Sequence, residues 1–167
     1  KPAGVFRIFL FGESAALGDP RPAYGVGRYL ETLLRERFPG MEFEVICVAM
    51  TAINSHAILP IARECARYEG NLWIIYAGNN EMAGPFGANT VFGSQAPPNA
   101  VVRSCLALLR TRTGQWLDAL VNRFRLADSS PANWAGLRMF LEHQLPPMDP
   151  RRELVYDNFR RNLNDIV

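Results

Sequence analysis

The sequence predicts an α/β fold with a parallel sheet. Three short apolar runs, residues 5–11, 43–48 and 72–77, have the length and composition of buried strands. Amphipathic segments separate these runs, so that strands and helices alternate along the chain. Because parallel neighbours are joined by helical crossovers, which are almost always right-handed, this alternation indicates one parallel sheet covered by helices.

Length and composition bound the class of protein. The 167 residues correspond to one domain, and a hydrophobic content of 49% with 20% charged residues is ordinary for a globular protein. A net charge of +2 gives no case for a nucleic-acid partner. No apolar run approaches the ~18 residues of a membrane-spanning helix, and none resembles a signal peptide, so we expect no membrane span in this segment.

The first strand is predicted over Val5–Phe11 and the helix after it over Tyr24–Phe38. Apolar residues recur in that helix at three- and four-residue spacing, which is typical of one buried face. The residues expected on the buried face are Val26, Tyr29, Leu30, Leu33, Leu34 and Phe38, and those expected on the opposite face are Arg28, Glu31, Arg35 and Glu36.

The second strand is predicted over Phe43–Val48 and the third over Leu72–Ala77, with a helix between them. Ser55 is the expected cap of that helix. Pro60 either kinks the helix or marks its true start, because proline is best tolerated in the first turn. The side chains expected to face inward are Ile58, Ile61, Ala62, Cys65 and Ala66.

The regular alternation ends after the third strand. Residues 82–148 are interpreted as a loop and a helical insertion that lies over one end of the sheet. Asp149 and Pro150 start a crossover helix, predicted over residues 149–167, since an N-cap followed by proline is a typical helix start. Apolar periodicity predicts helices inside the insertion at 101–109, 116–124 and 134–141, and in the crossover helix a buried face of Val155, Phe159, Leu163 and Ile166.

Residues 1–167 are interpreted as a single incomplete domain with its core in residues 1–81. A sheet of three parallel strands leaves an apolar edge bare, which proteins in water avoid. We therefore expect at least one further strand, from the remainder of a longer parent chain or from a second chain.

The three cysteines, Cys47, Cys65 and Cys105, each fall on an apolar face and are expected to be buried thiols. The sequence contains neither a CxxC pair nor a cluster of cysteine and histidine with the spacing of a zinc site. It therefore predicts no metal site and no cofactor.

Small or polar residues follow each predicted strand. The three segments are Gly12-Glu13-Ser14, Thr51-Ala52-Ile53-Asn54 and Gly78-Asn79-Asn80-Glu81. Because the carboxyl ends of neighbouring parallel strands meet at one edge of the sheet, a serine hydroxyl, backbone N–H groups and an asparagine amide are expected to converge there. Acyl transfer needs this set, a nucleophile and donors aimed at the oxyanion.

The three segments resemble the first three sequence blocks of the SGNH, or GDSL-like, hydrolase family. The resemblance implies a flavodoxin-like three-layer α/β/α sandwich and a serine esterase, lipase or deacetylase acting on a small ester or an acetylated glycan. It implies Ser14 as the nucleophile, and an oxyanion hole made by the Ser14 N–H, the Ala52 N–H and the Asn80 amide. The supporting residues that it implies are Gly12, Glu13, Gly78 and Glu81.

The chain departs from the family pattern at four points. Glu13 and Glu81 stand where the family has aspartate, and Ala52 stands where glycine is usual, so a positive φ there would be strained. The Asp-x-x-His block that supplies the general base is absent, because Ile53 and Phe140 occupy the positions three residues before the two histidines. The base is therefore expected from outside this chain, since a serine hydroxyl alone is a poor nucleophile.

Two other functions fit parts of the pattern. The same fold without a base would serve as a module that binds a glycan or a protein partner. A flavin or phosphate site at the first turn is the other alternative, although Glu13 places a negative charge beside the anion. The histidines have structural interpretations as well, His56 as a partly buried residue at a helix N-terminus and His143 as a surface residue.

Overall fold

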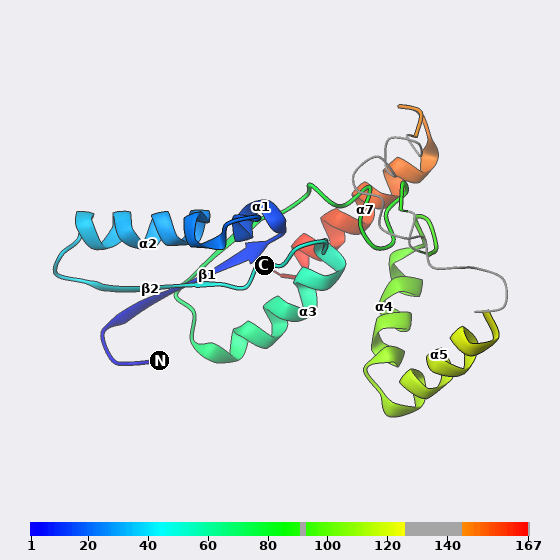
Figure 1. Ribbon diagram of the computed structural model, residues 1–167, viewed down its shortest axis with the longest axis horizontal. Helices are drawn as coiled ribbons and strands as arrows, with labels where there is room; N and C mark the ends of the chain where they lie inside the picture. The colour runs from blue at the N-terminus through cyan, green and yellow to red at the C-terminus, as the bar shows by residue number, and fades with distance from the viewer. Residues whose placement is uncertain (91–92, 126–144, 167) are drawn as a thin grey trace. The chain divides into compact units, whose positions relative to one another are not determined.

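The computed structural model describes residues 1–90, 93–125 and 145–166. The chain divides into two compact units (Figure 1). The first comprises Lys1–Glu81 with Phe159–Val167, and the second comprises Met82–Asn158. The last helix, α7 (Pro150–Asn164), begins in the second unit and ends in the first.

The first unit contains a parallel three-stranded sheet, which confirms the predicted α/β class. Its strands are β1 (Val5–Gly12), β2 (Glu42–Cys47) and β3 (Leu72–Tyr76). The order across the sheet is β2-β1-β3, so the first strand is central. This is the start of the flavodoxin-like order 2-1-3-4-5, in which ligands bind beyond the carboxyl ends of the strands.

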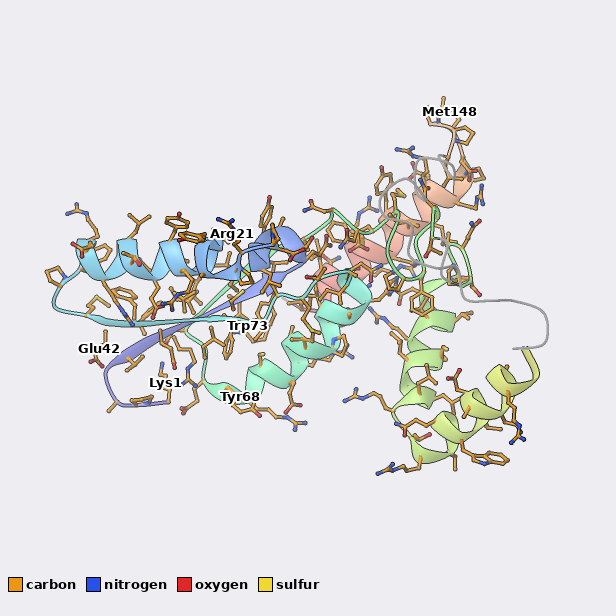
Figure 2. All side chains as sticks on the ribbon, viewed as in Figure 1. Lys1, Arg21, Glu42, Tyr68, Trp73 and Met148 are labelled. Carbon is orange, nitrogen blue, oxygen red and sulfur yellow. The ribbon has the colours of Figure 1, made fainter. Side chains whose placement is uncertain are left out.

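The central strand is buried on both faces. Successive residues Ile8, Phe9, Leu10 and Phe11 are almost fully excluded from solvent, and alternate side chains point to opposite sides of the sheet. Phe9 and Phe11 pack with the inner residues of α3 (Ser55–Cys65), which are Ile58, Ala62 and Cys65. Trp73, labelled in Figure 2, joins this cluster from β3 through an edge-on contact with Phe9.

Helix α2 (Val26–Arg37) covers the other face of the sheet, opposite α3 (Figure 1), after a short 3-10 helix, η1 (Pro22–Tyr24). The prediction of its buried face was wrong for four of the six apolar residues, whereas Leu30 and Leu34 are half-buried. Val26, Tyr29, Leu33 and Phe38 are about half exposed or more, whereas the residues turned inward are Gly27 and Glu31.

Glycine explains the orientation of α2. A Cβ added at Gly27 would lie 3.2 Å from Leu10 Cδ2 and 3.6 Å from Val45 Cγ1. The helix therefore comes closest to the sheet at Gly27, which has no side chain. Glu31 is tolerated on that side because it pairs with Arg28 at 2.9 Å and with Arg35 at 2.6 Å.

The N-cap of helix α3 is one residue earlier than predicted. Asn54, not Ser55, is the N-cap, and its side-chain oxygen accepts the His56 N–H at 3.3 Å. Pro60 lies inside the helix and does not mark its start. Ala66, expected to face inward, is exposed in the 3-10 helix η2 (Ala66–Tyr68) that follows.

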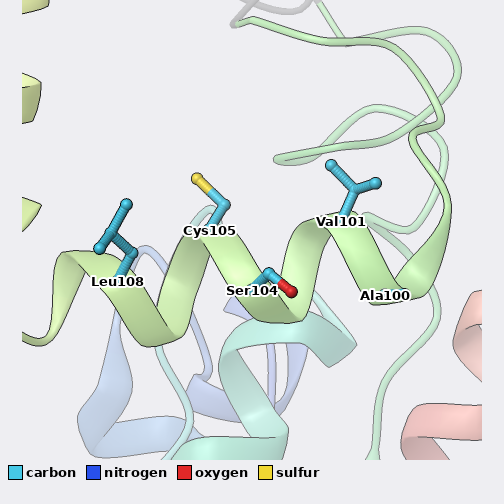
Figure 3. A pocket seen from close by; sticks show the side chains of 5 residues that line it. All are labelled: Ala100, Val101, Ser104, Cys105 and Leu108. Atoms are coloured by element: carbon cyan, nitrogen blue, oxygen red, sulfur yellow. The ribbon is translucent and has the colours of Figure 1, made fainter.

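The second unit contains helices α4 (Asn99–Leu109) and α5 (Arg112–Arg125), as the periodicity predicted. The predicted helix at 134–141 lies outside the described residues. An open apolar pocket on α4 is lined by Ala100, Val101, Ser104, Cys105 and Leu108 (Figure 3), none of which belongs to the predicted site. Within the described part of the chain, no helix is long and apolar enough to cross a membrane.

Two further expectations are corrected. Cys47 and Cys105 are exposed, and only Cys65 is buried, because Cys47 ends an edge strand and Cys105 faces outward from α4. On α7, Val155 is buried as predicted, but the most buried side chains are Asn158 and Asn162, polar residues that the apolar pattern does not select.

Candidate active site

Hydrogen bonds join the turn after β1 to the turn after β3. The Glu13 side chain is fully buried, and its two carboxylate oxygens accept the Gly78 N–H at 3.0 Å and the Asn80 N–H at 2.8 Å. Charge-assisted bonds of this kind are about twice as strong as neutral ones. The two turns are therefore held side by side at one edge of the sheet.

The loop after β2 joins the same edge. The Asn80 side chain donates from Nδ2 to the Ile53 carbonyl at 2.9 Å, and the Met50 N–H donates to the Gly12 carbonyl at 3.2 Å. The predicted convergence of three strand ends is thus present in the contacts of the first unit.

Ser14 is the first residue of a short helix, α1 (Ser14–Leu17), and it is partly buried. Glycine is required at position 12, two residues before it. A Cβ at Gly12 would lie 2.3 Å from the Tyr76 carbonyl oxygen and 2.4 Å from the Ala16 side chain. Among the described residues, none hydrogen-bonds to the Ser14 hydroxyl.

Ala52 has a left-handed backbone conformation, with φ of 62°. A non-glycine residue in this region is uncommon and strained by roughly 1–2 kcal/mol, since its Cβ crowds the following carbonyl. The sequence analysis identified this position as the one where alanine stands in place of glycine. Ala52 therefore adopts the backbone conformation that glycine favours.

Glu81 binds the start of helix α3. Its carboxylate accepts the Ser55 N–H at 2.7 Å and the Ser55 hydroxyl at 2.9 Å. Burial raises the pKa of Glu81 to about 7; the two bonds from Ser55 oppose this rise, and the nearby Glu13 charge adds to it. Glu81 is therefore a buried carboxyl that titrates near neutral pH.

One residue of this network, Asn162, was missed by the sequence reasoning. Asn162 donates from Nδ2 to Ser55 Oγ at 3.0 Å, and the same nitrogen lies 3.0 Å from His56 Nδ1. Because an amide nitrogen only donates, Nδ1 is the acceptor in this contact. A sequence signal existed: Asn158 and Asn162 are spaced four residues apart on one helix face.

The structure thus brings Glu13, Gly78 and Asn80 into direct contact, and Asn80 into contact with the neighbour of Ala52. Glu81 lies instead against Ser55. His56 is buried rather than partly buried, and His143 lies outside the described residues. No group of three metal-binding side chains occurs among the residues described.

These features define an α/β protein with a parallel sheet whose three strand ends are joined by a buried glutamate and an asparagine amide. Among solved structures, the chain is similar to one titled "Crystal Structure of TesA". The two are 11% identical with a TM-score of 0.42, over 96% of this chain and 99% of that chain. A likeness this distant carries no argument about activity. No family model matches the chain, and neither does any curated protein.

Proposed function

We propose that this protein is a serine hydrolase of the SGNH type, which cleaves a carboxylic ester or an acetyl group. Ser14 is the nucleophile. The observation that carries the proposal is the buried Glu13 carboxylate bound to the Gly78 and Asn80 N–H groups, because it ties the turn bearing Ser14 to the turn bearing Asn80.

The proposed chemistry divides the reaction into two acyl transfers. Ser14 Oγ attacks the carbonyl carbon, its proton passes through a base to the leaving alcohol, and water then hydrolyses the acyl-enzyme. The Ser14 N–H, the Ala52 N–H and the Asn80 amide stabilise the negative oxygen of each tetrahedral intermediate. One Asn80 N–H is held by the Ile53 carbonyl, and the second is the one assigned to the oxyanion.

The general base is proposed to come from the remainder of a longer parent chain or from a second chain. His56 is the one histidine within the described ranges, and its Nδ1 is engaged by Asn162. A base must lie within about 3.2 Å of the oxygen whose proton it abstracts, or reach it through one water. The substrate is proposed to be a small ester or an acetylated glycan.

Covalent labelling of the full-length protein with a fluorophosphonate probe tests the proposal. We expect one adduct, at Ser14, identified by peptide mass spectrometry, and none in Ser14→Ala. Asn80→Ala is expected to label about 10²-fold more slowly, because an oxyanion donor is lost. Ser104→Ala, an exposed serine on α4, is the matched control and should label like the wild type. Absence of an adduct from pH 5 to 9 would overturn the proposal.

A second candidate is a binding module of the same fold that performs no turnover. The buried, hydrogen-bonded state of His56 and the strained Ala52 in place of glycine favour it. Isothermal titration with acetylated oligosaccharides would distinguish the two, since this candidate expects heat of binding without release of acetate. Acetate release that disappears in Ser14→Ala would exclude it.

A further inference from the structure

Three hydrogen bonds hold the loop between β2 and α3, one before Ala52 and two after it. Before it, the Met50 N–H donates to the Gly12 carbonyl. After it, the Ile53 carbonyl accepts the Asn80 amide, and the Ser55 N–H donates to Glu81. Strained backbone persists only where the surroundings over-determine it, and Ala52 lies between the three bonds.

The bond between the Ser55 N–H and Glu81 belongs to a buried network of three polar side chains. The Ser55 hydroxyl donates to Glu81 Oε2 and accepts from Asn162 Nδ2, and all three side chains are at most 5% exposed. Because Asn162 can only donate through this nitrogen, it directs the Ser55 hydrogen toward Glu81. Removing any member leaves a buried polar group without its partner, so the three act as a unit.

We propose that Glu81, Ser55 and Asn162 are positioning residues, which hold Ala52 in its left-handed conformation and thereby aim its N–H at the oxyanion. Asn162 lies 107 residues from Ser55 in sequence, so the C-terminal part of α7 contributes to the geometry of a loop that is distant in sequence. This inference rests on the proposed function, because it concerns an oxyanion donor.

The decisive comparison is between Ser55→Ala and the same change combined with Ala52→Gly. Ser55→Ala removes the hydroxyl but keeps the backbone bond to Glu81, so the network is cut at one defined point. Glycine adopts the left-handed region without strain, so it should keep the loop in place when the network is cut. If the network only stabilised the fold, Ala52→Gly would not restore the labelling rate that Ser55→Ala lowers.

The experiment measures two quantities in the full-length protein. The first is the fluorophosphonate labelling rate, expected to fall about tenfold in Ser55→Ala and to return to within about threefold in the double variant. The second is amide hydrogen exchange at position 55, expected to be about tenfold faster in Ser55→Ala than in wild type, with core strand β1 unchanged.

Matched changes isolate the network. Asn162→Ala should reproduce Ser55→Ala in both measurements. Asn158→Ala removes a buried asparagine one turn earlier on α7, where its amide donates to the Pro97 carbonyl, and should leave position 55 unchanged.

Two outcomes overturn the positioning role. One is a double variant as slow as Ser55→Ala, and the other is a Ser55→Ala protein that labels and exchanges like Ser104→Ala. If the wild type does not label at all, the proposed function fails instead. The exchange rates at position 55 then still decide whether the network holds the loop, because they do not depend on activity.

Discussion

The Glu13 carboxylate accepts the Asn80 backbone N–H at 2.8 Å, across 67 positions of sequence. This bond links the residue before the candidate nucleophile to the candidate oxyanion donor itself. The same carboxylate binds the Gly78 N–H with its other oxygen, so one buried side chain fixes the path of the whole turn after β3.

Replacing Glu13 is expected to destabilise the protein strongly. Glu13→Ala leaves the Gly78 and Asn80 N–H groups without their acceptor, which should lower the free energy of unfolding by about 3–5 kcal/mol. Urea denaturation followed by circular dichroism measures the change. Glu36→Ala on the exposed side of α2 is the control and should stay within about 0.5 kcal/mol of wild type. A Glu13→Ala protein as stable as this control would contradict the structural role.

The stability should depend on the titration of Glu81. Its pKa is about 7 in the folded protein and near its ordinary value of 4.5 when unfolded. The folded state therefore binds the proton more tightly, so this group's contribution is complete below pH 4.5 and is lost as the pH rises through 7. The free energy of unfolding should fall by roughly 3 kcal/mol between pH 4.5 and 8.

Glu81→Gln isolates that pH dependence. Glutamine does not titrate, so the part of the slope due to Glu81 should vanish between pH 4.5 and 8, while Glu36→Gln should keep the wild-type slope. Urea unfolding at several pH values in this range provides the measurement. A Glu81→Gln protein with an unchanged slope would show that another group titrates in its place.

Ala52→Gly should be neutral or stabilising, by up to about 1 kcal/mol, because glycine relieves the strain of a left-handed φ at the cost of some chain entropy. The control is Ala57→Gly within α3, where the same change should cost about 1 kcal/mol through lost helix propensity. Thermal unfolding compares the two variants. If both lose stability equally, position 52 is not strained.

Gly12→Ala should disrupt the site. The added Cβ would lie 2.3 Å from the Tyr76 carbonyl oxygen, which is backbone of a paired strand and has little freedom to move. We expect a loss of about 3 kcal/mol or more in the free energy of unfolding, together with slower labelling of Ser14. Gly40→Ala, where no atom lies within 4 Å of an added Cβ, should be near neutral in both measurements.

Local pattern was sufficient for the three strands and for the meeting of their carboxyl ends at one edge of the sheet. Each predicted strand occurs within one residue of its expected bounds at either end, because short apolar runs of that length favour strands of a sheet covered on both faces. The polar residues at the strand ends converge because parallel topology brings those ends to one edge. The helix faces were less predictable: α2 turns Glu31 inward, since Gly27 decides how closely the helix can approach.

The sequence by itself determined the parallel α/β sheet, the position of Ser14 after the first strand and the departure from glycine at position 52. Only the tertiary structure decided the strand order β2-β1-β3, the two bonds of Glu13 and the contact of Asn162 with Ser55. The physical reason is the separation in sequence over which each interaction acts. Periodicity and strand length act between residues close in the chain, whereas the partner of a buried polar group is chosen by whichever distant segment packs against it.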